Sequence, residues 1–121
     1  MNAAANGSPR AADIARMHEC IDAMVPRLEE RAPRTRAERR VPDETFAELR
    51  EAGFFRLFQP LRYGGFEADP RDFFRAQARL AEGCMSSAWA GGIVSVHAFQ
   101  LALFDDRAQL AIAVGDRRRR P

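Results

Sequence analysis

Apolar residues recur at intervals of three and four in the first third of the chain, which is the spacing of one face of a helix. This stripe consists of Ile14, Met17, Ile21, Met24 and Leu28. Ser8-Pro9 precedes it as a cap followed by proline at the first helical position. Pro26 is expected to kink or shorten this helix, and Pro33 is expected to end it.

Caps and glycine stops predict two further helices. Asp43 begins the second, which buries Phe46 and Leu49 and stops at Gly53. Asp69-Pro70 opens the third, and Gly83 closes it. The inner face of the third is expected to hold Phe73, Phe74, Gln77, Leu80 and Ala81. Between these helices, the apolar run 54–58 is expected to be extended and buried, and 61–65 to be a loop with paired glycines.

A fourth helix is predicted from a Ser86 or Ser87 cap to about Leu103, followed by a short fifth helix from Asp105-Asp106 to near Gly115. The stripe of the fourth consists of Trp89, Ile93, Val96, His97 and Gln100. The pattern as a whole predicts an all-α domain of four or five helices over residues 10–110. Residues 1–9 are expected to be flexible, and 111–121 to form an atypical Arg-rich tail.

Composition supports one folded domain and excludes several functions. The chain has 121 residues, of which 46% are hydrophobic, enough for one core. Its net charge of +2 includes Arg117 to Arg120, so residues 1–116 carry −2. A body of that charge does not suit nucleic acid.

From the sequence we expect neither a membrane-spanning helix, nor an export signal, nor a metal site. It lacks an apolar run of about 18 residues, and its first ten residues lack an apolar core. Cys20 and Cys84 are therefore expected to be free thiols in a reducing, cytoplasmic compartment. No clustered Cys/His set is present, so no metal is expected.

Trp89 and His97 are the residues best suited to chemistry. They lie eight residues apart, which is two helical turns, roughly 12 Å along the axis and about 80° around it. One interpretation places a flat ligand on Trp89 and a polar ligand group at His97. The other makes them a core tryptophan and a satisfied buried histidine. Gly91-Gly92 between them leaves a similar choice, because either a neighbouring helix or a cofactor ring could approach closely there.

The junction before this helix and His18 carry weaker signals. Ser86 and Ser87 favour a helix cap over binding of an anion or a flavin carbonyl. Cys84 has no basic neighbour in sequence that would activate its thiol. His18 is interpreted as structural.

Three stretches together resemble a known family. These are the helix ending in Gly53-Phe54 with the following Pro60-Leu61-Arg62-Tyr63-Gly64-Gly65 loop, then Cys84-Met85-Ser86-Ser87-Ala88-Trp89, then His97-Ala98-Phe99-Gln100-Leu101-Ala102-Leu103-Phe104. The first resembles the N-terminal helical domain of acyl-CoA-dehydrogenase-fold flavoproteins. The other two are similar to oxygenase components of two-component flavin-dependent monooxygenases, the phenol hydroxylases of the p-hydroxyphenylacetate and secosteroid type.

The resemblance implies hydroxylation of a phenolic substrate with O2 and reduced flavin, either FMN or FAD, delivered by a separate flavin reductase. By similarity Trp89 packs near the flavin ring, and His97 holds or deprotonates the phenol as a catalytic and substrate-binding residue. Full-length members are expected to form homo-oligomers, in particular tetramers. They also have a central β-domain and a C-terminal helical bundle. This chain departs from the family after Gln109, and it is expected to be a truncated or frameshifted product without turnover of its own.

Two other functions stay open at this point. One is a fragment of an FAD-dependent acyl-CoA dehydrogenase that oxidises a CH–CH bond. The other is a non-catalytic helical module that binds a partner protein.

Overall fold

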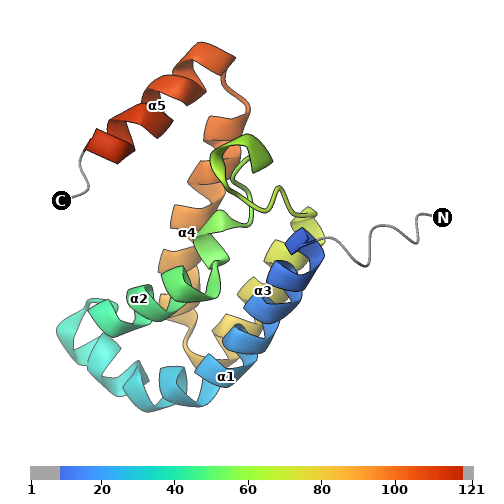
Figure 1. Ribbon diagram of the computed structural model, residues 1–121. Coiled ribbons are helices and arrows are strands. Elements are labelled where there is room, and N and C mark those ends of the chain that lie inside the picture. Colours follow the sequence, from blue (N-terminus) through green and yellow to red (C-terminus); the bar gives the residue numbers. More distant parts are fainter. Residues whose placement is uncertain (1–8, 119–121) are drawn as a thin grey trace.

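The computed structural model describes residues 9–118, and all the regular elements in this range are helical (Figure 1). Five α-helices and two short 3-10 helices follow one another along the chain: α1 (Pro9–Glu38), α2 (Asp43–Ala52), η2 (Phe54–Arg56), η3 (Leu61–Tyr63), α3 (Pro70–Gly83), α4 (Met85–Ala102) and α5 (Asp106–Arg118). The predicted all-α class is therefore confirmed. Residues 1–8 of the start that was predicted to be flexible, and residues 119–121 of the predicted Arg-rich tail, lie outside the described residues.

Helix α1 is longer than predicted, because it continues through Pro33 to Glu38. It bends on the way, and its C-terminal half turns towards α2 (Figure 1). Both Pro26 and Pro33 are exposed, so water can bond the carbonyls that these prolines leave without a helical partner. The prediction that Pro33 ends the helix is wrong, since contacts to α2 hold this half of α1 in place.

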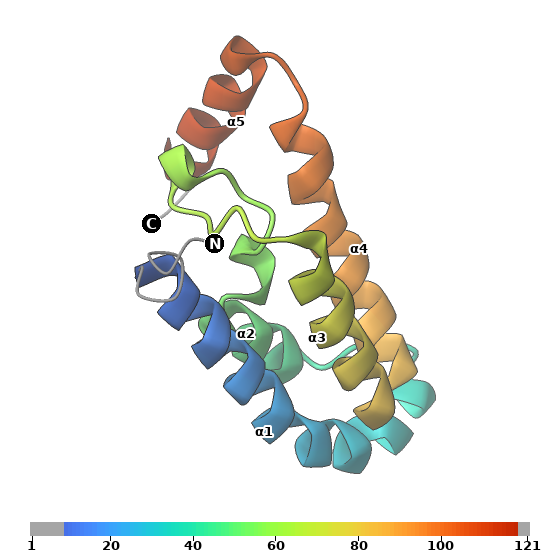
Figure 2. The same ribbon diagram turned by 90° about the vertical axis from the view of Figure 1, so that its right-hand side faces the viewer.

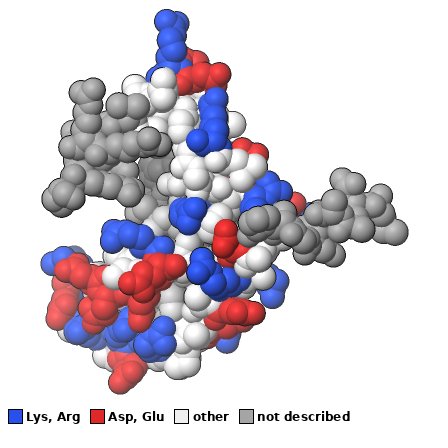
Figure 3. All heavy atoms as spheres, viewed as in Figure 1, with Lys and Arg blue, Asp and Glu red and all other residues white. Residues whose placement is uncertain are grey.

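Those contacts are ion pairs between the two helices. Arg31 donates from Nη1 to Glu48 at 2.8 Å, and Arg27 donates from Nε to the same carboxylate at 2.9 Å. Arg34 pairs with Glu44. Acidic and basic side chains are accordingly interleaved over this part of the surface (Figure 3). The bonds from Arg31 and Arg34 lower the pKa values of Glu48 and Glu44, respectively.

The turn after α2 brings the chain back into the core. Gly53 ends α2 with a φ of 87°, a left-handed conformation that glycine adopts without strain, as predicted. The next residues form η2 and a turn rather than the expected extended segment. Short apolar runs do not reveal their backbone conformation by periodicity, which explains this error.

The core lies where α1 packs along α3 and where α4 packs on α3, α2 and η2 (Figure 2). Its fully buried side chains include Met17, Ile21, Met24 and Leu28 of α1, with Leu49, Phe54, Leu57, Phe66 and Leu80 from the rest of the chain. The predicted α1 stripe therefore packs inward. Phe74 was predicted on the inner face of α3 but is exposed, and the neighbouring small residue Ala76 is buried instead.

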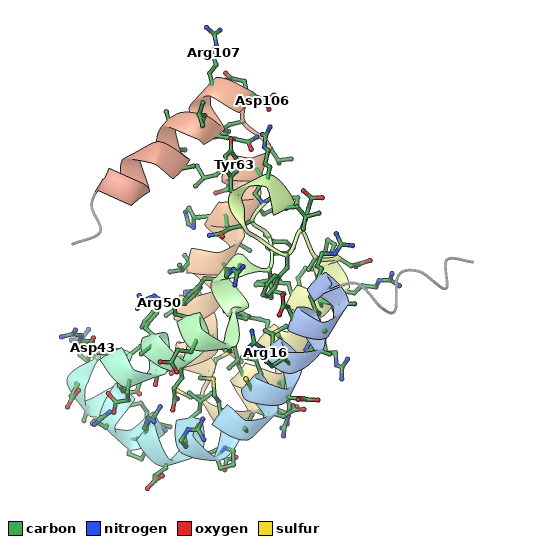
Figure 4. The ribbon with its side chains drawn as sticks, in the orientation of Figure 1. Arg16, Asp43, Arg50, Tyr63, Asp106 and Arg107 are labelled. Carbon is green, nitrogen blue, oxygen red and sulfur yellow. The ribbon has the colours of Figure 1, made fainter. Side chains whose placement is uncertain are left out.

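Helix α5 leaves the domain at a braced corner and ends at Arg118 rather than near Gly115. Asp105 caps it by accepting the backbone N–H groups of Arg107 and Ala108 at 2.9 and 3.0 Å. Arg62 of η3 donates from Nη2 to Asp106 at 2.9 Å and to Gln109 at 2.6 Å. Figure 4 shows this corner, with Tyr63 and Asp106 labelled.

Candidate functional site

Helix α4 packs on the domain with its small residues rather than with its large ones. The buried positions are Ser87, Ala88, Gly91, Gly92 and Ser95. Ser95 is fully buried and donates its hydroxyl to the Phe54 carbonyl at 3.2 Å. Small side chains allow the α4 backbone to approach its neighbours closely, so the large apolar residues remain on the other side.

The two glycines of α4 serve this close packing. A Cβ on Gly91 would lie 3.0 Å from Leu49 Cδ1, and one on Gly92 would lie 2.4 Å from Gln77 Nε2. Both positions are covered by the domain's own side chains. The close approach that the glycines permit is therefore by α2 and α3, not by a cofactor ring.

Four of the five residues of the predicted α4 stripe share a face that points away from the domain, whereas the fifth, Val96, is partly buried and packs against the core. Trp89 is 67% exposed, and Ile93, His97 and Gln100 are exposed as well. In Figure 2, α4 runs along one edge of the molecule with α1, α2 and α3 on its other side. Trp89 is therefore not a core residue. We call the face that carries Trp89, Ile93, His97 and Gln100 the outer face of α4.

His97 has its hydrogen-bonding pattern set by its own helix. Its Nδ1 lies 2.6 Å from the Ile93 carbonyl oxygen. A carbonyl oxygen only accepts hydrogen bonds, so Nδ1 carries the proton and donates. In the neutral ring, Nε2 then has a free lone pair at the surface of the domain. His97 thus offers an acceptor to a ligand that carries a hydrogen-bond donor.

The N-terminus of α4 differs from the predicted serine cap. The helix begins at Met85, directly after Cys84, which is buried and extended at φ −161°. No side chain caps it; Ser86 is exposed within the first turn and Ser87 is buried. The serines therefore lie inside the helix, because Cys84 alone makes the turn from α3.

The remaining candidates from the sequence are His18, a metal site and a membrane span. His18 Nε2 lies 3.0 Å from Asp72 Oδ1, which ties α1 to α3. Within residues 9–118, no group of three or more His, Cys, Asp or Glu side chains is arranged to hold a metal ion. No helix in the same range is both long and apolar enough to cross a bilayer.

A cavity of about 530 Å³ lies at the α4–α5 corner and was not predicted. It is lined by Phe58, Pro60, Leu61, Arg62, Glu67, Ala68, Pro70, Phe99, Ala102 and Gln109. Its lining residues come from segments up to 51 positions apart in the sequence. No local sequence pattern could therefore predict the cavity. Phe99 packs on Phe58 with ring centroids 5.3 Å apart, so the cavity borders the inner side of α4 and not the outer face.

The outer face of α4 carries no formal charge. The twenty residues from Met85 to Phe104 contain no Asp, Glu, Lys or Arg, although charged residues make up 30% of the chain. A flat, uncharged ring fits such a surface beside Trp89. The face offers no cation for a phosphate group, so groups outside it would have to hold the phosphate of a nucleotide cofactor.

Comparison with known proteins identifies similar domains. Residues 12–109 match the family model of the acyl-CoA dehydrogenase N-terminal domain. The chain is 46% identical over 89 residues to the oxygenase subunit HsaA, a flavin-dependent monooxygenase of Rhodococcus jostii. It is 37% identical over 100 residues to the oxygenase component of p-hydroxyphenylacetate 3-hydroxylase from Acinetobacter baumannii.

A solved structure shows the same fold. The crystal structure of 3-HSA hydroxylase from Rhodococcus sp. RHA1 superposes with a TM-score of 0.77 and 38% identity, over 92% of this chain and 27% of that one. The two curated relatives are matched over 74% and 83% of this chain but only 23% and 24% of their own length. The chain therefore spans about a quarter of the proteins that it matches.

Proposed function

Because the chain belongs to the acyl-CoA dehydrogenase N-terminal domain family, we propose that it is the N-terminal part of the oxygenase component of a two-component, flavin-dependent monooxygenase. The proposed substrate is a phenol, and the proposed partner is a reductase that supplies reduced FMN or FAD. The names of both relatives support this proposal, since one is an oxygenase subunit and the other an oxygenase component.

The orientation of the His97 ring is the observation that carries the proposal. Nδ1 donates to the Ile93 carbonyl, so Nε2 accepts from the ligand. A phenol hydroxyl is a donor and fits this nitrogen. The thioester oxygen of an acyl-CoA is an acceptor and does not, which argues against the acyl-CoA dehydrogenase alternative.

The residues of the outer face have distinct roles in this proposal. Trp89 packs against the flavin ring and shields one side of the substrate from water. His97 holds the phenol hydroxyl at Nε2 and takes up its proton, which raises the electron density of the aromatic ring. A reduced flavin bound beside Trp89 would activate O2, and one oxygen atom of that O2 would be transferred to the aromatic ring.

We further propose that the isolated chain does not hydroxylate phenols. The outer face provides one wall of a site, and a preorganised site needs walls on its other sides. Purified chain supplied with reduced flavin, O2 and a panel of phenols is expected to give no coupled product above background. Hydroxylated product in this assay would refute the claim of inactivity.

A chimera tests the proposed function itself. Residues 12–109 would replace the matching region of the Rhodococcus jostii oxygenase subunit, which would be assayed with its own reductase and substrate. The expected result is hydroxylation, because this domain would restore the missing wall. A folded chimera that binds flavin but hydroxylates no substrate would argue against the proposal.

A further inference from the structure

Ile93 lies midway between Trp89 and His97 on the outer face of α4. It follows Trp89 by four residues and precedes His97 by four. Each of these steps is roughly 6 Å along the helix axis and about 40° around it. The Ile93 side chain is 43% exposed, so a ligand that reaches from Trp89 to His97 passes directly over it.

The imidazole of His97 is held on the same side of the helix as Ile93. Side chains on a helix lean towards its N-terminus, and the bond from Nδ1 to the Ile93 carbonyl at 2.6 Å fixes the ring above the turn between the two residues. A phenol whose hydroxyl donates to Nε2, and whose ring extends towards a flavin beside Trp89, therefore rests on Ile93. The backbone of Ile93 orients the acceptor, and its side chain meets the aromatic ring.

The other residues between Trp89 and His97 leave this space to Ile93. Ala90 is small and ends at its Cβ. Val94 is exposed (49%), but it lies about 100° around the helix from Ile93, outside the sector between Trp89 and His97. The remaining four are buried or pack against the core: Gly91, Gly92, Ser95 and Val96. Between positions 89 and 97, Ile93 is thus the one large side chain that projects into the space above the outer face.

We propose that Ile93 is the specificity-determining residue of the outer face, an inference that rests on the proposed function. Its branched side chain is stiff at the first torsion and cannot swing aside, so its bulk sets how close an aromatic ring comes to α4. No residue from Met85 to Phe104 is charged, so a charged substituent finds no partner there. The substrate class is therefore a phenol whose edge towards α4 carries hydrogen atoms only, with any bulky or charged substituent on the side away from the helix.

The chimera described above tests this role through substrate binding and turnover. Ile93→Phe fills part of the space and should weaken binding of the chimera's own substrate at least about tenfold, since a change of a single methylene in an apolar site is worth about 10–200-fold. Binding is measured without O2, by titration of the chimera loaded with reduced flavin, and KM is measured with O2. The kcat should fall less than KM rises, because the variant loses substrate binding and keeps the acid–base group.

Two further variants sharpen the test. Ile93→Ala removes most of the side chain and should shift the preference from phenol to 2-isopropylphenol, which has an alkyl group beside the hydroxyl, by at least about tenfold in the same anaerobic titration. Val94→Phe is the matched control, because it introduces the same ring at a residue of similar exposure (49%) that lies outside the space. It should change the dissociation constant and KM by no more than about twofold.

The outcomes separate the role of Ile93 from the proposed function. A chimera with Ile93 that gives no product contradicts both. A chimera that hydroxylates its substrate, and whose Ile93→Phe variant keeps the dissociation constant within about twofold, contradicts the role of Ile93 alone. Equal losses from Ile93→Phe and Val94→Phe also overturn that role. Ile93→Ala decides the matter if Ile93→Phe no longer binds flavin, and an unchanged preference for phenol would then overturn the proposal.

Discussion

The side chain of Gln77 on α3 lies over Gly92 on α4, where a β-carbon would come 2.4 Å from its amide nitrogen. That nitrogen donates to the Ala88 carbonyl at 2.7 Å and holds the two helices together. The side-chain oxygen of the same amide, Gln77 Oε1, is buried without a hydrogen-bond partner. Close packing of α4 is thus achieved at the expense of one unsatisfied acceptor.

The contact between Gln77 and Gly92 predicts a coupling between the two positions. Gly92→Ala should lower the free energy of unfolding by about 1 kcal/mol in total. Displacing Gln77 breaks its bond to Ala88 and leaves the amide unpaired, which costs roughly 2 kcal/mol, and the helix preference of alanine offsets about 1 kcal/mol of this loss. In a Gln77→Ala background, the same substitution should instead stabilise by up to about 1 kcal/mol, the helix preference of alanine over glycine. Urea denaturation of the four proteins measures this coupling. Additive effects would show that Gln77 does not occupy the space beside Gly92.

The exposure of Trp89 predicts that its side chain contributes little to folding of the isolated domain. Trp89→Ala should change the free energy of unfolding by no more than about 0.5 kcal/mol for the monomer, as is usual for surface positions. Phe54→Ala should cost about 3–5 kcal/mol, because Phe54 is fully buried. Denaturation at a concentration where the chain is monomeric measures both values. A loss of several kcal/mol for Trp89→Ala would place this residue in the core.

The hydrogen bonds of Asp69 predict how the stability of the domain changes at acidic pH. It caps α3 by accepting the Arg71 backbone N–H at 2.8 Å, and the Arg71 side chain also bonds to it. These bonds lower the pKa of Asp69 to about 2. Because the folded pKa is below the unfolded value of about 3.9, the contribution of Asp69 is complete above that pH and fades as the pH falls towards 2.

Asp69→Asn should remove this pH dependence, because asparagine caps helices about as well but does not titrate. The stability difference between the natural protein and the variant should therefore shrink as the pH falls from 5 to 2. Thermal unfolding at several pH values measures it. A difference that stays constant over this range would contradict the lowered pKa.

The hydrogen bond of His97 predicts its tautomer. Long-range proton–nitrogen NMR spectra at high pH should show the proton of His97 on Nδ1. The chain has two histidines, so the signals can be assigned with His18→Gln. A proton found on Nε2 would remove the acceptor on which the proposed phenol contact depends.

Local signals in the sequence predicted most helix boundaries. The Asp69-Pro70 start of α3 and the Gly53 stop of α2 depend on neighbouring residues only, and both are confirmed. The end of α1 predicted at Pro33 is wrong. Ion pairs between α1 and α2 stabilise the helix beyond this proline and outweigh its local tendency to end the helix. Tertiary contacts of this kind are not visible in a single sequence.

The orientation of α4 could not be predicted for a different reason. The spacing correctly groups Trp89, Ile93, His97 and Gln100 on one face, but it wrongly adds Val96, which packs against the core. It does not say which face is buried, because the other face, with Ser87, Ala88 and Gly91, contains no charge either. Only the packing of the glycines against Leu49 and Gln77 decides the matter.

The central claim is that the outer face of α4 holds the phenol through His97. The hydroxylation rate of the Rhodococcus chimera with His97→Phe, relative to the chimera with His97, tests it most directly. A loss of about 100-fold or more is expected, the range of positioned acid–base groups. His18→Gln is the matched control and should leave the rate unchanged, since His18 only joins α1 to α3. Equal rates with and without His97, in chimeras that bind flavin equally well, would contradict the claim.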